Sequence, residues 1–127
     1  MRIRPAGWLM ALGGLFVTGA AAAAALSAGA DPEATVRLYA NVCSGCHGAG
    51  LEGASASALL GPAFRISWPH ALGLFEFVAA NMPLGAGGSL RAQQYWDLVA
   101  HILRRNDVRV PEPFTAERAA ETTLRRS

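Results

Sequence analysis

The sequence of 127 residues contains no lysine, only two cysteines and few charged side chains. Arginine therefore supplies all of its basic residues, and two arginines, Arg2 and Arg4, lie at the extreme N-terminus. The remaining arginines balance the carboxylates and form no basic stripe, which excludes the usual electrostatic footprint of a nucleic-acid-binding protein. Charged residues make up 16% of the chain and apolar residues 52%, a composition typical of one globular or membrane-associated domain.

Because Cys43 and Cys46 are the only cysteines, a framework of several disulfides is excluded. Two thiols three residues apart are typical of a redox dithiol, half a zinc site or a haem attachment site. Zinc needs four ligands, and apart from the residues of this motif the chain offers only His70, His101 and carboxylates. A thioredoxin-type dithiol needs strands alternating with helices, and the sequence shows no such alternation.

The first thirty residues have the features of an export signal. Residues 1–4 are basic, residues 8–26 are apolar without a charge, and Ala28-Gly29-Ala30 places small residues where a signal peptidase cleaves. We predict a signal peptide over residues 1–30 and a mature protein in the periplasm. The alternative is an uncleaved membrane anchor, since about 18 or more apolar residues can span a bilayer.

The residue that decides between the uses of the two thiols is His47, directly after the second cysteine. Cys-x-x-Cys-His is the attachment signature of haem c. Two thiols at this spacing can each add to one haem vinyl group as a thioether, and the adjacent imidazole then lies under the iron. The sequence therefore predicts one haem c bound covalently through Cys43 and Cys46, with His47 as an axial ligand of the iron.

Met82 is the candidate for the second axial ligand. It is the only methionine after residue 10, and the chain has no lysine that could replace it. Pro83 favours an extended conformation for Met82 and ends the helix before it. Of the other histidines, His101 falls in an amphipathic helix, where packing at the rim of the core is expected, and His70 follows Pro69 at a helix start, where we expect exposure.

The apolar spacing predicts an all-α fold. Asp31-Pro32-Glu33 has the cap, proline and acid of a helix start, and Val36, Tyr39 and Ala40 then share one face. Residues 48–57 are rich in Gly, Ala and Ser, which predicts a loop that follows the haem closely.

Two further helices are predicted downstream. Trp68-Pro69 opens one of them, which ends at Met82, and Ser89 is the expected N-cap of the last long helix, which ends near Asn106. We predict a haem-binding domain over residues 31–108. Residues 109–127 are expected to form a charged C-terminal tail, solvated or loosely held, in which Thr115 could cap one more exposed helix.

These motifs together resemble class I monohaem cytochromes c. The resemblance rests on Cys43-Ser44-Gly45-Cys46-His47, Gly61-Pro62, Asn81-Met82-Pro83 and the helix pattern of residues 95–103, and it covers about residues 31–106. It implies a cytochrome c-like fold of three to four helices wrapped around one covalent haem, in which the last helix crosses the first. The chain looks closest to small bacterial periplasmic cytochromes associated with dehydrogenases, those of sulfur-compound oxidation among them.

The resemblance also implies roles for three residues around the haem. Pro62 matches the proline whose carbonyl accepts the proton of the axial histidine, here His47, at its Nδ1 atom. Arg65 and Trp68 are placed where a guanidinium or an indole N–H could bind a haem propionate, although packing or solvation is an equal alternative for each.

With both axial positions filled, the iron would have no open site, so we expect an electron carrier and no enzyme. Its expected partner is a redox protein, either a periplasmic dehydrogenase, of which it would be the cytochrome subunit or acceptor, or a terminal oxidase reached by a freely diffusing shuttle. A haem peroxidase or gas sensor with an open distal side is the remaining alternative. We expect no nucleic acid as partner, and contact with a membrane only if residues 1–30 stay attached.

Docking of that partner is expected at apolar loops. Residues 48–51 and 83–86 are apolar and follow the two predicted iron ligands, and we expect Leu51 and Leu84 to lie on the contact surface. The absence of lysine removes the lysine ring on which many shuttle cytochromes dock, which favours a dedicated partner. The nearly neutral mature chain also predicts a weak dependence of association on ionic strength.

Overall fold

The computed structural model describes residues 31–125, and these residues fold into six helices, α1 to α6, without a strand between them. Three helices are long, and three are short pieces of four to seven residues. The bounds are α1 (Pro32–Val42), α2 (Ser44–His47), α3 (Gly61–Ser67), α4 (Ala71–Asn81), α5 (Ala92–Arg105) and α6 (Ala116–Glu121). The all-α prediction is confirmed. The predicted signal peptide lies outside the described residues.

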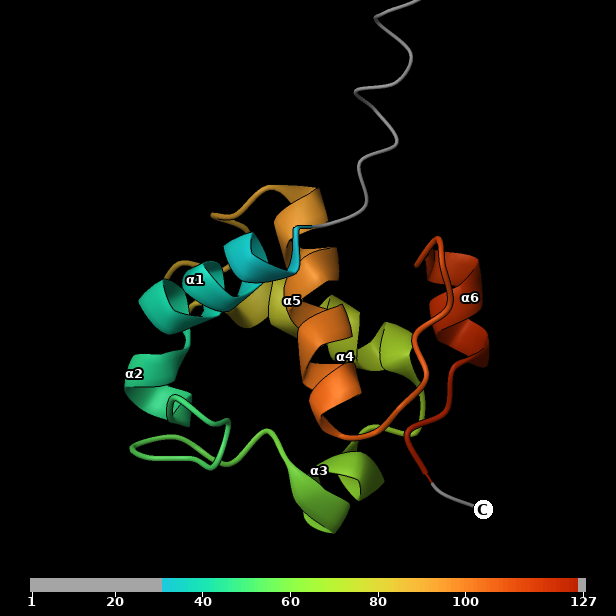
Figure 1. The fold of residues 1–127 in the computed structure, drawn as a ribbon, viewed down its shortest axis with the longest axis horizontal. Coiled ribbons are helices and arrows are strands. Elements are labelled where there is room, and N and C mark those ends of the chain that lie inside the picture. Colours follow the sequence, from blue (N-terminus) through green and yellow to red (C-terminus); the bar gives the residue numbers. More distant parts are fainter. Residues whose placement is uncertain (1–30, 126–127) are drawn as a thin grey trace, which may run out of the picture.

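Helix α5 is the centre of the fold, and α1 and α4 both pack against it (Figure 1). Its amphipathic pattern explains this position, because its buried residues recur at helical spacing: Tyr95, Leu98, Val99, Ile102 and Leu103. At the end of α4, Pro83 acts as predicted. The helix ends at Asn81, and Met82 is extended, with φ −114° and ψ 149°.

The start of α5 differs from the prediction. The helix begins at Ala92, so Arg91 and not Ser89 is the N-cap. The Gln94 side chain accepts a hydrogen bond of 3.0 Å from the Arg91 N–H. Ser89 instead ends the preceding turn, where its N–H donates to the carbonyl of Ala86. A side chain three residues inside the helix thus fixes the boundary, and Ser89 lies outside it.

The C-terminal segment is packed against the domain. Thr115 caps α6 as predicted, and its hydroxyl accepts from the Arg118 N–H. Ala119 of α6 is fully buried. Beyond α6, Thr123 forms an isolated antiparallel bridge with His70, and Leu124 is fully buried as well. The expected solvated tail is therefore not observed over residues 109–125. Although most residues of this segment are polar or charged, Ala119 and Leu124 belong to the buried core.

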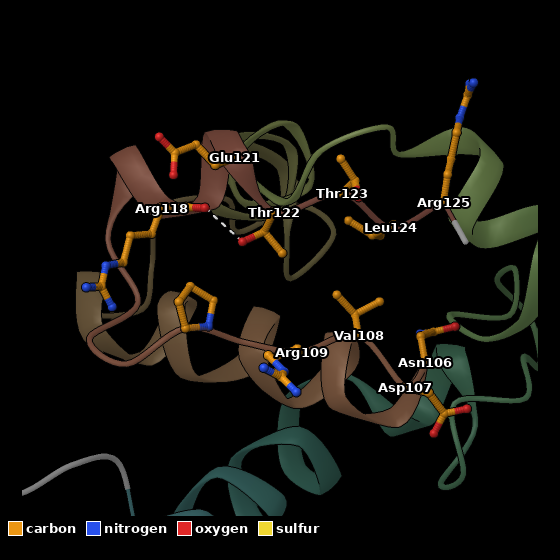
Figure 2. Close-up of a pocket in the computed structure, with 11 residues that line it drawn as sticks. Asn106, Asp107, Val108, Arg109, Arg118, Glu121, Thr122, Thr123, Leu124 and Arg125 are labelled. Atoms are coloured by element: carbon orange, nitrogen blue, oxygen red, sulfur yellow. Dashed lines mark hydrogen bonds between the residues drawn. The ribbon is translucent and has the colours of Figure 1, made fainter. Parts of the chain in front are cut away.

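An open cavity of about 480 Å³ separates this segment from the chain that follows α5. Figure 2 shows Val108 and Leu124 on the two facing sides, with Arg118 and Glu121 from α6 at one end. The Thr122 hydroxyl donates 2.8 Å to the Arg118 carbonyl and closes the end of α6. In the described part of the chain, no helix is long and apolar enough to cross a membrane.

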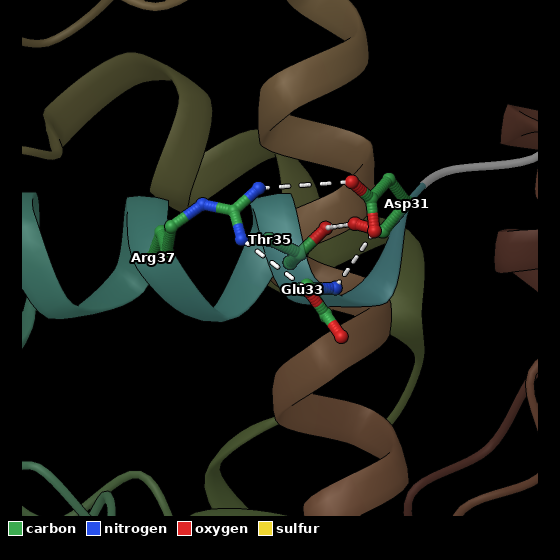
Figure 3. Close-up of polar contacts among 4 residues, drawn as sticks. All are labelled: Asp31, Glu33, Thr35 and Arg37. Atoms are coloured by element: carbon green, nitrogen blue, oxygen red, sulfur yellow. Dashed lines mark hydrogen bonds and ion pairs between the residues drawn. The ribbon is translucent and has the colours of Figure 1, made fainter.

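Helix α1 begins as the sequence predicts and leads into the Cys-x-x-Cys-His motif. The Asp31 carboxylate accepts 3.0 Å from the Glu33 N–H, and Arg37 lies within 3.7 Å of both acids (Figure 3). The helix is rotated relative to the prediction, because Thr35 and Tyr39 are its buried residues, whereas Val36 is 51% exposed. Ala40 is exposed as well. The single bulky ring of Tyr39 determines which face of α1 meets α5.

Candidate functional site

The Cys-x-x-Cys-His motif forms the one-turn helix α2 directly after α1. The chain passes from one helix to the next at Cys43, and the N–H groups of Cys46 and His47 both donate to the Cys43 carbonyl. One helical turn places the residues at positions 43, 46 and 47 on one side, because three and four residues are close to one turn. Both thiols and the imidazole are therefore expected on the same side of this turn.

The two thiols are free and differ in environment. Cys43 is half-buried and Cys46 is exposed. Burial raises the pKa of the Cys43 thiol to about 11, so this thiol stays protonated near neutral pH. A redox dithiol needs a lowered pKa on its attacking cysteine, and Cys43 has the opposite shift. In residues 31–125, no group of three or more His, Cys, Asp or Glu side chains is placed to hold a metal ion.

The ring of His47 is oriented by a backbone carbonyl. Its Nδ1 atom lies 2.8 Å from the carbonyl oxygen of Ser57. Because a carbonyl only accepts, Nδ1 carries the proton, and Nε2 keeps the lone pair that can bind iron. The resemblance assigned this acceptor to Pro62, and the structure places Ser57 there instead. Pro62 lies in the first turn of α3, where carbonyls accept from amides further along the helix.

The loop after the motif folds back onto it. The carbonyl of Cys46 accepts 2.9 Å from the Ala56 N–H, and that of His47 accepts 2.7 Å from the Gly53 N–H. The Tyr39 hydroxyl donates 2.8 Å to the carbonyl of Gly48. Burial, and then the negative charges that Cys43 and Glu52 would carry, raise the pKa of Tyr39 to about 12. These hydrogen bonds fix the loop against the Cys-x-x-Cys-His motif.

Leu51 lies inside that loop and is fully buried, so the expectation that it lies on a contact surface is wrong. Its N–H donates to the Gly48 carbonyl, and its carbonyl accepts from Leu59. The turn at residues 48–51 reverses the chain and points Leu51 inward. Leu84, by contrast, is 85% exposed, as expected for the other loop.

Met82 is held through its backbone on both sides. Its N–H donates 2.9 Å to Val78 at the end of α4, and its carbonyl accepts 2.7 Å from the Tyr95 hydroxyl of α5. The Leu90 N–H donates to the same hydroxyl. Met82 itself is only half-buried, and its extended backbone leaves the side chain outside the helix. The loop that carries the predicted ligand is thus tied to both α4 and α5.

Arg65 and Trp68 lie at the C-terminal end of α3. Arg65 lines an open cavity of about 450 Å³ together with Pro62, Ile66 and Arg125. The Trp68 ring lies 5.2 Å from the Phe77 ring of α4. Both side chains are half-buried, and their predicted contacts with haem propionates stay predictions.

The other two histidines lie outside this group. His70 is exposed at the start of α4, as expected. His101 is half-buried, with its ring 5.5 Å from that of Tyr39, which confirms its expected place at the rim of the core. Burial, and then Arg105 and Arg104, lower the pKa of His101.

The sequence did not predict several residues whose hydrogen bonds hold the motif, Met82 or the loop after the motif. These are Tyr39, Tyr95 and the buried Asn106 of the α5 C-cap, together with the Ser57 carbonyl. The two tyrosines appear in the sequence as ordinary members of apolar stripes. Asn106 appears as a helix stop, and a backbone carbonyl has no signal in the sequence.

An all-helical domain with a one-turn Cys-x-x-Cys-His helix and a central α5 crossed by α1 defines a cytochrome c domain. Comparison with protein families places it further: residues 30–102 match the model of "Cytochrome C oxidase, cbb3-type, subunit III", and the chain belongs to this family. Searches of curated proteins and of solved structures returned no match. Membership implies a covalent haem c and an electron-carrier domain.

The residues present fit such a haem. Two free thiols are available for thioether bonds, and the His47 tautomer leaves Nε2 available for iron. Apolar side chains suited to covering a porphyrin stay partly or largely exposed on α3 and α4, with Ile66 at 63% and Phe77 at 42%.

Proposed function

We propose that the chain is a periplasmic electron-transfer protein that carries one electron on a haem bound through Cys43 and Cys46, with His47 and Met82 as axial ligands. The observation that carries the proposal is the His47–Ser57 hydrogen bond, which fixes the ring with Nε2 available beside two free thiols. A thioether opposite an imidazole favours ferrous iron and so raises the reduction potential relative to two imidazoles.

The chain's own residues keep this site rigid. Ser57 orients His47, Tyr95 holds the Met82 backbone, and the folded-back loop ties its Gly53 and Ala56 amides to the motif. Rigid ligands suit electron transfer, because little has to reorganise when iron changes its oxidation state. With both axial positions taken, oxygen and peroxide have no place to bind, which separates this proposal from a peroxidase or gas sensor.

Covalent attachment is tested by staining a denaturing gel for haem peroxidase activity. The wild-type protein, expressed with its first thirty residues in a host that matures c-type cytochromes, should keep its haem after boiling. Cys46→Ser should give little holoprotein, since at most one thioether can form. A stain that is absent from the wild type, or unchanged in Cys46→Ser, contradicts the proposal.

Axial ligation is tested by exchanging Met82 for His. The haem should stay low-spin while the reduction potential falls, because imidazole donates more strongly than a thioether to ferric iron. The ferric absorption band of iron–sulfur bonding should vanish as well. An unchanged potential and a band absent from the wild type would show that Met82 is no ligand and would favour the open-site alternatives.

For the partner, we propose a redox protein that docks at the loop after Met82. Leu84 is 85% exposed there, beside the predicted iron ligand, so a partner bound to it would lie close to the haem. A periplasmic dehydrogenase is the partner proposed first. The name of the family supports a terminal oxidase as the alternative acceptor.

The docking proposal is tested with Leu84→Glu and the matched control Val36→Glu. Val36 is an exposed apolar residue of α1, so both variants place a carboxylate on the surface. Leu84→Glu should slow electron transfer with the co-purified partner without changing the potential much, whereas Val36→Glu should transfer at the wild-type rate. Equal rates for both variants, with a steep loss of rate at high salt, would move the docking site to a charged cluster.

A further inference from the structure

The C-cap of α5 is connected to the predicted haem ligands through one buried side chain, that of Asn106. It is 2% exposed and is one of only two buried polar residues in the described chain. A buried amide needs partners for its two N–H groups and its oxygen, because leaving them without partners is costly. Asn106 satisfies these needs with three hydrogen bonds.

Two of these bonds leave the helix. The Asn106 Oδ1 atom accepts 3.0 Å from the Gly61 N–H, and its Nδ2 donates 2.8 Å to the Leu59 carbonyl. The third goes from Nδ2 to the Ile102 carbonyl of the same helix, at 2.9 Å. Asn106 thus holds the backbone on both sides of Leu60, across more than forty residues of sequence. The Asn106 amide accepts from Gly61 and donates to Leu59 at the same time.

The segment held in this way is the one that orients His47. Ser57, whose carbonyl accepts the His47 Nδ1 proton, lies two residues before Leu59. The Leu59 N–H donates 2.9 Å to the carbonyl of the buried Leu51, while the Leu59 carbonyl accepts from Asn106. Both backbone polar groups of Leu59, its N–H and its carbonyl, are therefore hydrogen-bonded. On the other side of Ser57, the Ala56 N–H donates 2.9 Å to the Cys46 carbonyl of the motif, so the side-chain bond of Asn106 is the contact that ties this segment to α5.

We infer that Asn106 is a positioning residue for the proximal haem ligand, acting through the Leu59–Gly61 backbone and the Ser57 carbonyl on His47. This inference rests on the proposed function. A strong hydrogen bond at Nδ1 increases the electron donation of the imidazole to iron and favours the ferric state. Loss of the Asn106 bonds loosens the Ser57 carbonyl, weakens that donation and raises the reduction potential.

Two substitutions separate this role from simple capping of α5. In Asn106→Asp the carboxylate still accepts from Gly61 but cannot donate to Leu59 or Ile102. In Asn106→Ser the hydroxyl can still donate to the Ile102 carbonyl, four residues back, but is too short to reach Leu59 and Gly61. Val99→Ala is the control, because it removes packing from a fully buried position of the same helix and leaves the side-chain hydrogen bonds to Leu59 and Gly61 in place.

The readouts are the reduction potential and, by NMR, the exchange of the His47 Nδ1 proton with solvent. Both Asn106 variants should speed this exchange by about tenfold or more, as the loss of supporting hydrogen bonds eases local opening. Asn106→Ser, which adds no charge, should also raise the potential. The potential of Asn106→Asp is not part of the test, because its added carboxylate by itself favours ferric iron. Val99→Ala should change neither, even where it lowers the melting temperature by the same amount. Equal effects of Val99→Ala and the Asn106 variants would overturn the inference.

A measurement on the wild type keeps the test valid if the variants do not fold. In native-state hydrogen exchange, the exchange rates of the Gly61 amide and the His47 Nδ1 proton should rise together with denaturant, because both protons are exposed by one cooperative opening. Independent opening of the two groups would overturn the role of Asn106. Failure of the proposed function is recognised separately, because the wild type would then carry no haem on the denaturing gel.

Discussion

At the scale of single residues, tyrosine hydroxyls secure both sides of the site. Tyr39 of α1 donates to the carbonyl that follows the His47 motif, and Tyr95 of α5 donates to the carbonyl of Met82. Both tyrosines are almost fully buried. Each hydroxyl therefore supplies the hydrogen bond that water would otherwise donate to the carbonyl. The two hydroxyls have the same chemistry, but one binds the backbone after His47 and the other binds the backbone of Met82.

Tyr95→Phe and Tyr39→Phe are therefore a matched pair. Each should lower the free energy of unfolding by about 1 kcal/mol, because one buried hydrogen bond is lost. Only Tyr95→Phe should weaken the bond of Met82 to iron, seen as a ferric iron–sulfur band that disappears at lower pH than in the wild type. If Tyr39→Phe lowers that pH by the same amount, the Tyr95 bond has no special link to Met82.

His101 predicts how stability depends on pH. Its pKa is lowered from 6.5 by burial and by the nearby Arg105 and Arg104, while Tyr39 is the titratable group that faces it from α1. Below about pH 6.5, His101 therefore binds a proton more readily in the unfolded chain than in the folded protein. Stability is full above about pH 6.5 and falls as the pH decreases toward the folded pKa. His101→Gln should flatten this fall in urea titrations of the holoprotein, and an unchanged slope would assign it to other groups.

At the scale of elements, the turn between α4 and α5 depends on a close approach of two backbones. A methyl group at Gly87 would overlap the Ala80 carbonyl oxygen of α4. The neighbouring Gly88 donates its N–H to Ala79 at 2.9 Å. The backbone of the loop that follows Met82 therefore packs directly against the last turn of α4. Glycine is needed at position 87 because a Cβ atom there would overlap the Ala80 carbonyl.

Gly87→Ala should destabilise the protein and disturb Met82 ligation, because the loop must move off α4. Gly73→Ala is the control within α4, where a Cβ atom meets nothing within 4 Å. Alanine there should raise the free energy of unfolding by about 0.5–1 kcal/mol through its better helix propensity. Thermal melts and the iron–sulfur band of both variants test the pair. A neutral Gly87→Ala would contradict the packing described.

At the scale of the whole molecule, the chain after α5 closes the domain. Thr122 and Leu124 exchange backbone hydrogen bonds with the start of α4, at Ala71 and Pro69. Leu124 joins the same buried cluster as Leu74 of α4. The family match ends at residue 102, so this closing segment is built from residues beyond it.

Leu124→Ala should lower the free energy of unfolding by about 2 kcal/mol or more, since a fully buried leucine is truncated. Thr123→Ala, at the exposed neighbouring position, should change it by less than about 0.5 kcal/mol. Chemical denaturation of the holoprotein distinguishes the two. Equal, small effects would mean that the C-terminal segment is loosely held in solution, as the sequence alone predicted.

The sequence by itself determined the features that depend on neighbouring residues. The cap at Asp31, the stop at Pro83 with an extended Met82, and the helical turn at the Cys-x-x-Cys-His motif all follow from local backbone rules, and the structure shows each of them. The all-helical class follows from apolar spacing in the same way.

Only the tertiary structure decided which distant groups meet. The acceptor for His47 is Ser57 rather than Pro62, Leu51 points inward, and Asn106 binds the backbone on both sides of Leu60. The physical reason is that burial and hydrogen bonding depend on the path of the chain in space. Every residue has a backbone carbonyl, so the sequence cannot indicate which carbonyl will accept from His47. The partners of Asn106 are decided only when packing excludes water and leaves the Leu59, Gly61 and Ile102 backbone within reach.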